Sequence, residues 1–304
     1  MVYTVLPALI PNIKEVYNAY FSAFAAEKMG QLMLQVLFPG ADVNSDEFRT
    51  ASAAATLDYW HKSDTQYTFK CVNMDTGEIV GIALGDIYIN PRSAEERKNH
   101  GVPWLEGEQR ERAEKILNPL WEMREKLFGG QPYIYAHVIG VDPRHQGLKA
   151  GAALASWGID LSNRTGLPIY FESSPSAVGL YEKLGYERLK ETIVHRADVM
   201  GTDEDISVPL MVRMPAAAKG TSFYEWKELG YPKWAQLPAK EKPATVEKAA
   251  PVTAPAEAPV PVSAPVEAAP KSEKEPVQPE DLKQKGSFAK VLSGLKSRLG
   301  LSKI

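Results

Sequence analysis

The residues of this sequence with the clearest chemical potential surround a strand-to-helix junction near position 146. A β-type run, Tyr-Ile-Tyr-Ala-His-Val-Ile-Gly-Val, ends at Val141 and is followed by a short loop and a helical pattern. Such a junction presents main-chain N–H groups and the positive end of a helix dipole, and small residues let a ligand approach the backbone. The pattern predicts an anion site suited to a pyrophosphate, formed by Gln146, Gly147, Leu148, Lys149, Ala150 and Gly151.

Side chains of types that can transfer protons occur before and after this loop in the sequence. His137 is four residues before Val141, Glu172 lies in the next β-type run, and Tyr181 follows in a helical segment. A histidine titrates near ~6.5 and therefore suits a general base. A dinucleotide site is not indicated, because the sequence has no Gly-x-Gly-x-x-Gly at this loop.

The loop and the later segment Leu-Tyr-Glu-Lys-Leu-Gly-Tyr together resemble the GNAT superfamily of acetyl-CoA-dependent N-acyltransferases. The family loop reads (Gln/Arg)-x-x-Gly-x-(Gly/Ala), and Gln146 and Gly151 match its first and last positions. Lys149 stands where the family usually has glycine, so its side chain would either crowd a phosphate or add a positive charge. The downstream match is complete, with Leu180, Tyr181, Glu182, Gly185 and Tyr186.

The resemblance implies direct transfer of an acetyl group from acetyl-CoA to a primary amine, with no acyl-enzyme and no metal. Main-chain N–H groups from Ile139 to Val141 would stabilise the oxyanion, and Gly140 suits the bulge that separates this strand from the next. Ile139, Val141 and the loop would contact the acetyl-CoA donor. Ser174 would contact it too, because many relatives have an asparagine near the pantetheine arm at this position. Ser174 is also a good helix cap.

The resemblance also assigns the proton transfers. Tyr181 would protonate the departing thiolate, since the pKa of a phenol, near ~10, is close to that of a thiol, near ~8.5, so that the proton transfer is nearly balanced. His137 would deprotonate the amine, as a histidine at this relative position does in relatives that acetylate arylalkylamines, and Glu172 is the rival base. Glu172 could instead hold a cationic amine or orient Ser174. Strand alternation places Tyr135, His137 and Ile139 on one face unless a bulge shifts the register.

The elements that must position these residues occupy the first 236 positions. Helical patterns over 12–36 and 46–60 precede a predicted hairpin, and β-α-β-α-β-β follows from position 133. We therefore expect an α/β fold with a GNAT-like mixed, mostly antiparallel sheet flanked by helices. Between positions 90 and 130 lies a charged insertion, in which Asn118-Pro119 indicates a helix start. This insertion either covers the site or lies on the surface without contributing to the site.

Composition divides the chain of 304 residues into three parts. Residues 1–236 have the composition of a globular domain. Residues 237–280 are rich in Pro, Ala, Glu and Lys, with 10 of the 23 prolines between positions 238 and 279, which indicates a disordered linker. Residues 281–304 form a basic amphipathic helical pattern with Phe288, Leu292 and Leu299 on one face. This segment would contact a membrane surface or a protein partner, or would dock on its own domain or barely fold.

Global properties exclude several classes of protein. The net charge is −3, so nucleic-acid binding is not expected, and no apolar run is long enough to span a membrane. The single cysteine, Cys71, indicates a reducing compartment, and we expect the cytoplasm or the nucleus. We therefore predict an N-acetyltransferase that acts on a small amine. The alternatives are a protein or peptide acetyltransferase recruited by its tail, and a non-catalytic acyl-CoA-binding module. The acceptor and the oligomeric state cannot be read from the sequence.

Overall fold

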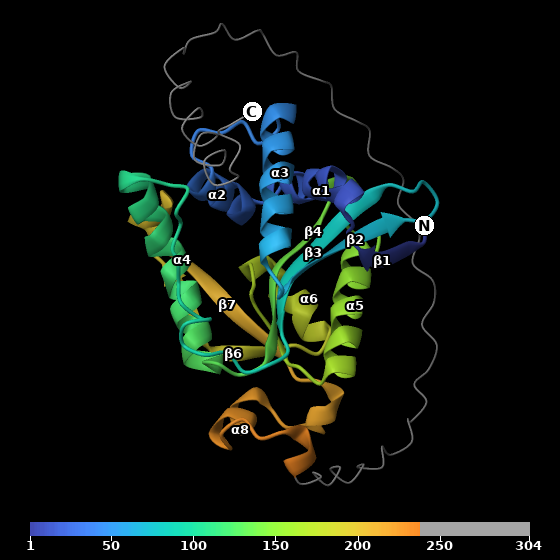
Figure 1. Ribbon diagram of the computed structural model, residues 1–304, viewed down its shortest axis with the longest axis vertical. Helices are drawn as coiled ribbons and strands as arrows, with labels where there is room; N and C mark the ends of the chain where they lie inside the picture. The colour runs from blue at the N-terminus through green and yellow to red at the C-terminus, as the bar shows by residue number, and fades with distance from the viewer. Residues whose placement is uncertain (238–304) are drawn as a thin grey trace, which may run out of the picture.

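The computed structural model describes residues 1–237, apart from the side chains of residues 58–61. The predicted linker and the basic C-terminal segment lie outside these residues from position 238 onward. The described part contains one sheet of seven strands in the order β1-β2-β3-β4-β5-β7-β6 (Figure 1). The strands are β1 (Tyr3–Pro7), β2 (Gln66–Asn73), β3 (Ile79–Tyr88), β4 (Tyr133–Val141), β5 (Ile169–Glu172), β6 (Glu187–His195) and β7 (Ile206–Arg213).

All neighbouring strands are antiparallel except β4 and β5, which run parallel. The expected mixed, mostly antiparallel sheet is thus confirmed. The edge strand β1 was not predicted, because it has only five residues and ends at a proline. The helices are α1 (Ile13–Ala25), α2 (Lys28–Leu37), α3 (Asp46–Lys62), α4 (Gly107–Phe128), α5 (Ala150–Thr165), α6 (Val178–Lys183), α7 (Ala197–Met200) and α8 (Phe223–Glu228).

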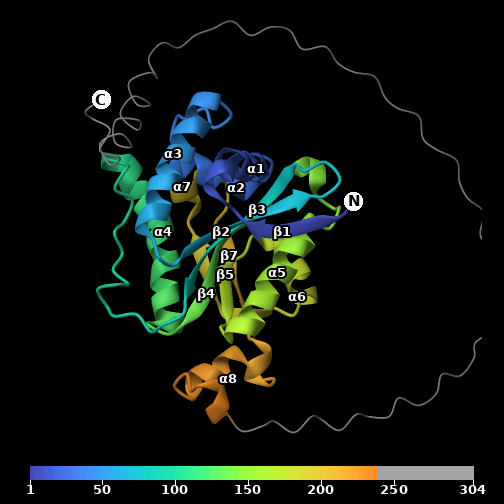
Figure 2. The same ribbon diagram turned by 45° about the vertical axis from the view of Figure 1, so that its right-hand side comes forward.

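Helices cover both faces of the sheet (Figure 2). On one face, α5 and α6 pack on Ile134, Ile169 and Phe171. On the other face, Leu127 and Phe128 of α4 pack on Tyr133, Tyr135 and Tyr170 of β4 and β5. Ala23 of α1 lies against Gly140 at the far end of β4, on the same face as α4. The two faces of β4 and β5 therefore meet different helices, and this difference determines how the site is built.

The charged insertion contains one long helix rather than a helix that starts at Asn118. α4 begins at Gly107, and Pro119 lies inside it. A proline in a helix interior removes one hydrogen bond but does not prevent a helix whose apolar face is buried. Ala113 and Ile116, before the proline, and Leu127 and Phe128, after it, are all buried. Burial along the whole helix therefore outweighs the local start signal.

Candidate active site

The central feature of the site is a divergence of β4 from β5. These two strands are paired only at Ile134 with Ile169 and at Tyr135 with Tyr170. Beyond Tyr135, β4 continues to Val141 and is paired on its β3 side. Within the described residues, the main chain of this part of β4 thus has no strand partner on the β5 side, and we call this divergence the opening between β4 and β5. The predicted separation of the two strands is present, and it begins at Ala136.

The bulge in β4 lies at His137, not at Gly140. Leu84 of β3 is opposite Val138, and the next residue, Gly85, is opposite Ala136, so His137 is the extra residue. An extra residue bends a strand and increases its twist, which explains why β4 leaves β5 here. The bulge also reverses the side-chain alternation. Tyr135 packs with α4, whereas Ile139 packs with the cluster around α5, so the two do not share one face, as expected where a bulge shifts the register.

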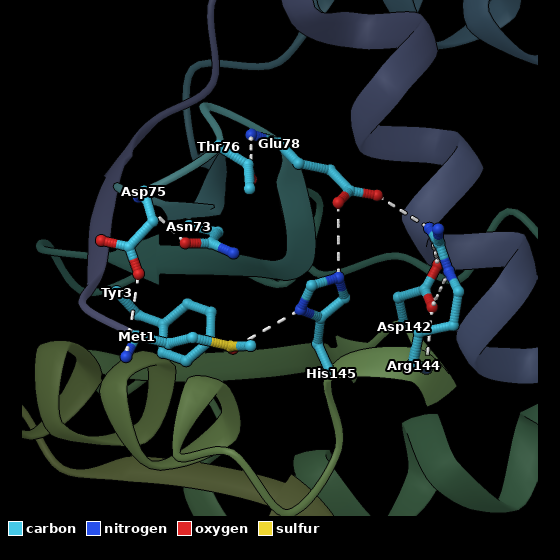
Figure 3. A network of polar contacts seen from close by, with 9 residues as sticks. All are labelled: Met1, Tyr3, Asn73, Asp75, Thr76, Glu78, Asp142, Arg144 and His145. Atoms are coloured by element: carbon cyan, nitrogen blue, oxygen red, sulfur yellow. Dashed lines mark hydrogen bonds and ion pairs between the residues drawn. The ribbon is translucent and has the colours of Figure 1, made fainter.

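Residues 142–145, which lie between β4 and the predicted anion loop, are fixed by a polar network (Figure 3). The Asp142 carboxylate accepts a hydrogen bond from the main-chain N–H of Arg144 at 2.9 Å, and the Arg144 guanidinium donates to Glu78 at 2.8 Å. His145 lies 3.4 Å from Glu78 and 3.4 Å from the Tyr3 hydroxyl. These contacts join the segment to β1 and to the turn between β2 and β3, so the backbone that enters the anion loop is held in place.

The loop itself has the exposure and the backbone geometry that an anion site needs. Gln146, Gly147, Leu148 and Lys149 are exposed, and α5 starts at the buried Ala150. The first N–H groups of a helix have no acceptor within the helix, so those of Ala150 and Gly151 are available to a ligand. A Cβ added to Gly147 would meet no atom within 4 Å, so there is open space beside this residue.

Lys149 has a backbone conformation that favours glycine. It is the N-cap residue of α5 and has a φ of 75°, in the left-handed region. A residue with a Cβ atom is destabilised by about 1–2 kcal/mol in this conformation. The turn thus forms with a lysine in place, and the exposed Lys149 side chain adds a positive charge beside the loop.

His137 contacts an acidic residue that the sequence analysis missed. Its Nε2 lies 2.7 Å from Oδ2 of Asp86 in β3, and its ring lies edge-on to Tyr135 with centroids 4.2 Å apart. The side chain of His137 is 32% exposed, whereas that of Asp86 is 8% exposed. The sequence could have indicated Asp86, because it is the charged residue inside the apolar run Ile-Val-Gly-Ile-Ala-Leu-Gly-Asp-Ile-Tyr.

Glu172 is engaged in a separate network with α4. Its Oε1 accepts a hydrogen bond from Arg124 at 3.3 Å, and its Oε2 accepts one from the Tyr135 hydroxyl at 2.9 Å. Arg124 also donates to that hydroxyl at 2.8 Å. Burial would lower the pKa of Arg124, but the facing Tyr135 and Glu172 raise it above its ordinary value. Both carboxylate oxygens of Glu172 are thus occupied by a permanently charged guanidinium and a phenol.

Tyr181 lies on the opposite face of the sheet from His137. Its ring packs on Phe171 and Tyr186, with centroids 4.5 Å and 5.5 Å away, beside α5 and α6. Burial raises the pKa of Tyr181 to about 12. This pKa is further from that of a thiol than the sequence analysis assumed, and the phenol therefore stays protonated throughout the physiological range.

Ser174 is the N-cap residue of the short 3-10 helix Pro175–Ala177 that precedes α6. Its hydroxyl makes no cap hydrogen bond to a main-chain N–H of that helix and instead shares a hydrogen bond with the Ser176 hydroxyl at 3.1 Å. The predicted cap position is therefore correct, although the side-chain cap is not formed. Ile139 and Val141 are partly buried against the α5 cluster. Among residues 1–237, no group of three His, Cys, Asp or Glu side chains could hold a metal ion, and no helix could cross a membrane.

Both the sequence and the fold are similar to those of known proteins. The profile of the acetyltransferase (GNAT) family matches residues 34–186. The probable acyltransferase SID5 of Ajellomyces capsulatus is 34% identical over 127 residues, which are 42% of this chain and 88% of that protein. The crystal structure of arylalkylamine N-acetyltransferase 2 from Aedes aegypti has a TM-score of 0.50 at 15% identity, covering 70% of this chain and 99% of that one.

Proposed function

The chain belongs to the acetyltransferase (GNAT) family, and we propose that it transfers an acetyl group from acetyl-CoA directly to a primary amine of a small molecule. Enzymes of this family use an acyl-CoA donor. The observation that carries the proposal is the opening where β4 leaves β5, because the anion loop lies at one end of β4 and His137 lies at the start of the divergence.

The donor would be held largely by main-chain groups. The N–H groups from Gly147 to Gly151 lie in the exposed loop and at the start of α5, and they would bind a diphosphate together with the helix dipole. Ser174, at the start of the segment that carries Tyr181, would contact the donor from the other side of the opening. The main-chain N–H groups of β4 between Ile139 and Val141 would stabilise the oxyanion of the tetrahedral intermediate.

The acid and the base would act from opposite faces of the sheet. Tyr181 is among the side chains on the α5 and α6 face, and His137 lies beside Tyr135 on the α4 face. A thioester in the opening between β4 and β5 would therefore meet a proton donor on one face and a proton acceptor on the other. The amine would approach from the α4 face, where His137 takes its proton, and Tyr181 would protonate the departing thiolate.

His137 suits the role of base better than Glu172. The ring of His137 has one nitrogen on Asp86 and is 32% exposed, whereas the Glu172 side chain is 9% exposed and both its oxygens accept hydrogen bonds. Proton abstraction by Glu172 would first require these contacts to break. We therefore assign Glu172 to holding α4 and Tyr135 in place beside the base.

A small acceptor is favoured because α4 covers this face. The helix packs on β4 and β5 and places Arg124 within hydrogen-bond distance of Tyr135 and Glu172. The insertion between β3 and β4 thus forms one wall of the acceptor side. A wall of this kind limits the approach of a folded protein surface more than that of a free amine.

Release of free thiol from acetyl-CoA tests the proposal. A panel of polyamines, arylalkylamines, amino acids and aminoglycosides is compared with peptides that carry lysine or a free N-terminus, and hydrolysis without acceptor is subtracted. We expect thiol release and an acetylated product with at least one small amine. Release with peptides alone would replace the proposal by a protein acetyltransferase. Binding of acetyl-CoA by calorimetry with no release for any acceptor would also contradict it.

We further propose that residues 1–236 form the complete catalytic unit, with residues 237–280 as a linker and residues 281–304 as a docking segment. The sheet, the loop and both proton-transfer residues all lie before position 237. A chain ending at Leu237 should keep the kcat/KM of the full chain for the best amine of the panel. A loss of more than tenfold, with the protein still folded, would place part of the site in the removed segment.

A further inference from the structure

The most strongly held acidic side chain of the site is Asp86, which has no role in the function described so far. It lies in β3 opposite Tyr135, and the residue is 6% exposed. Its Oδ2 is bonded to His137 at 2.7 Å and accepts a hydrogen bond from the Tyr88 hydroxyl at 2.9 Å. Its Oδ1 accepts a hydrogen bond from the Thr65 hydroxyl at 3.0 Å. A carboxylate with three side-chain partners has one fixed orientation.

We propose that Asp86 is a positioning residue for acyl transfer, which holds His137 in the tautomer whose Nδ1 accepts the proton of the amine. The inference rests on the proposed function and adds the group that makes His137 a base. Nε2 is the ring nitrogen that contacts Asp86, so Nδ1 is the nitrogen that remains for the acceptor. The carboxylate accepts, so Nε2 must carry the hydrogen and Nδ1 must carry the lone pair.

The proton balance of the step follows from this arrangement. As the amine nitrogen bonds to the thioester carbon, the C=O π electron pair moves to the oxygen, one N–H bond of the amine breaks and a bond from Nδ1 to that proton forms. When the oxyanion then collapses, the C–S bond breaks and the departing thiolate takes a proton from Tyr181. The resulting imidazolium keeps its Nε2–H on Asp86, and the carboxylate stabilises the new positive charge without taking a proton itself. Asp86 thus fixes the tautomer before the step and stabilises the charge after it.

The ionisation of Asp86 agrees with this role. Burial alone would raise its pKa, but the hydrogen bond and the charge of His137, together with the hydroxyl groups of Tyr88 and Thr65, lower the pKa below its ordinary value. The carboxylate is therefore ionised across the whole range in which a histidine titrates. A neutral acid at this position would accept a hydrogen bond from Nε2 much less strongly.

The other charged groups around His137 act at longer range. The Tyr135 ring is in contact with His137, and the Tyr135 hydroxyl bonds to Glu172 and Arg124, which face each other as a pair of opposite charges. These two charges largely cancel at His137. Among the contacts recorded for the described residues, the Asp86 carboxylate is the charge that bonds to the ring directly.

Nitrogen NMR of the histidine rings tests the proposal without requiring turnover. His137 is assigned by the loss of its signals in His137→Gln, and the signals of its two ring nitrogens show which of them carries the hydrogen in the neutral ring. We expect the hydrogen on Nε2 in the wild type, whereas in Asp86→Asn, whose amide can also donate, we expect a mixture of the two tautomers or the reversed one. The kcat of Asp86→Asn should be reduced on the order of 100-fold, with the KM for acetyl-CoA unchanged.

Matched variants separate positioning from folding. Glu172→Gln should keep the hydrogen on Nε2, because Glu172 bonds to the Tyr135 hydroxyl and not to the His137 ring. The wild-type spectrum keeps the test available if Asp86→Asn does not fold. A neutral ring with its hydrogen on Nδ1 in the wild type, or an unchanged tautomer in folded Asp86→Asn, would overturn the proposal. Failure of the proposed function would appear differently, as a wild type that has the hydrogen on Nε2 but releases no thiol.

Discussion

Two regions along β4 differ in the groups that they offer, main-chain groups after Val141 and side chains at His137. After Val141 the chain leads into a loop whose proposed function depends on main-chain N–H groups, and the residues from Gln146 to Lys149 are exposed. At His137 the strand meets buried side chains from β3, β5 and α4, joined by short hydrogen bonds. The first region depends on the path of the backbone, and the second depends on the identity of each side chain.

This difference predicts how the two regions respond to substitution. A site made of main-chain groups tolerates a new side chain as long as the turn is kept, and Lys149 in a left-handed conformation is an example. A site made of packed polar side chains loses a partner with every substitution, and the partner that remains is left unsatisfied. The following predictions compare the two regions, from the largest effect to the smallest.

Removal of the Tyr181 hydroxyl should have a large effect on turnover. In Tyr181→Phe the ring packing on Phe171 is kept and only the proton donor is lost, so we expect kcat to fall on the order of 100-fold with little change in Tm. Because burial raises the pKa of Tyr181 to about 12, the wild type should show no loss of activity from deprotonation of this phenol below about pH 11. An alkaline limb near pH 9 that disappears in Tyr181→Phe would contradict this account.

Separation of the buried ion pair on the α4 face should cost stability. Arg124→Met removes the partner of Glu172, and both side chains are largely buried, at 18% and 9% exposed. We expect the free energy of unfolding to fall by about 2 kcal/mol, measured by denaturant titration. Arg110 on the same helix pairs with Glu114 at 2.7 Å but is 45% exposed, so Arg110→Met is the matched control and should change the unfolding midpoint little. Equal effects of the two variants would show that the buried pair of Arg124 and Glu172 contributes no more to the free energy of unfolding than an exposed pair.

Substitution in the anion loop should have the smallest effect. Lys149→Gly removes the left-handed strain and the charge together, whereas Lys149→Ala removes the charge and keeps the strain. We expect Lys149→Gly to unfold at a higher temperature than Lys149→Ala, and both to weaken acetyl-CoA binding only a few-fold in calorimetry. A loss of binding above 100-fold in either variant would show that the side chain, not the backbone, holds the donor.

The same contrast explains which features could be predicted from the sequence. The loop from Gln146 to Gly151 and the segment around Tyr181 are each contiguous in the sequence, so the strand-to-helix pattern and the resemblance to the family pointed to them, and the family profile spans both. The network around His137 joins residues 86, 137 and 172 with α4, and neither Asp86 nor Arg124 belongs to a contiguous motif. The bulge at His137 depends on the pairing of β4 with β3, which strand alternation cannot show. Pro119 misplaced the start of α4 because burial of the helix outweighs a local signal.

The pH dependence of kcat/KM in three proteins tests the central claim most directly. The wild type, His137→Gln and Glu172→Gln are compared at saturating acetyl-CoA with the best small amine of the panel. We predict that Glu172→Gln keeps the rising acid limb of the wild type at the same pH, and that His137→Gln loses this limb together with a factor of roughly 10²–10⁴ in rate. A limb that persists in His137→Gln and disappears in Glu172→Gln would show that Glu172 is the base and would contradict the account.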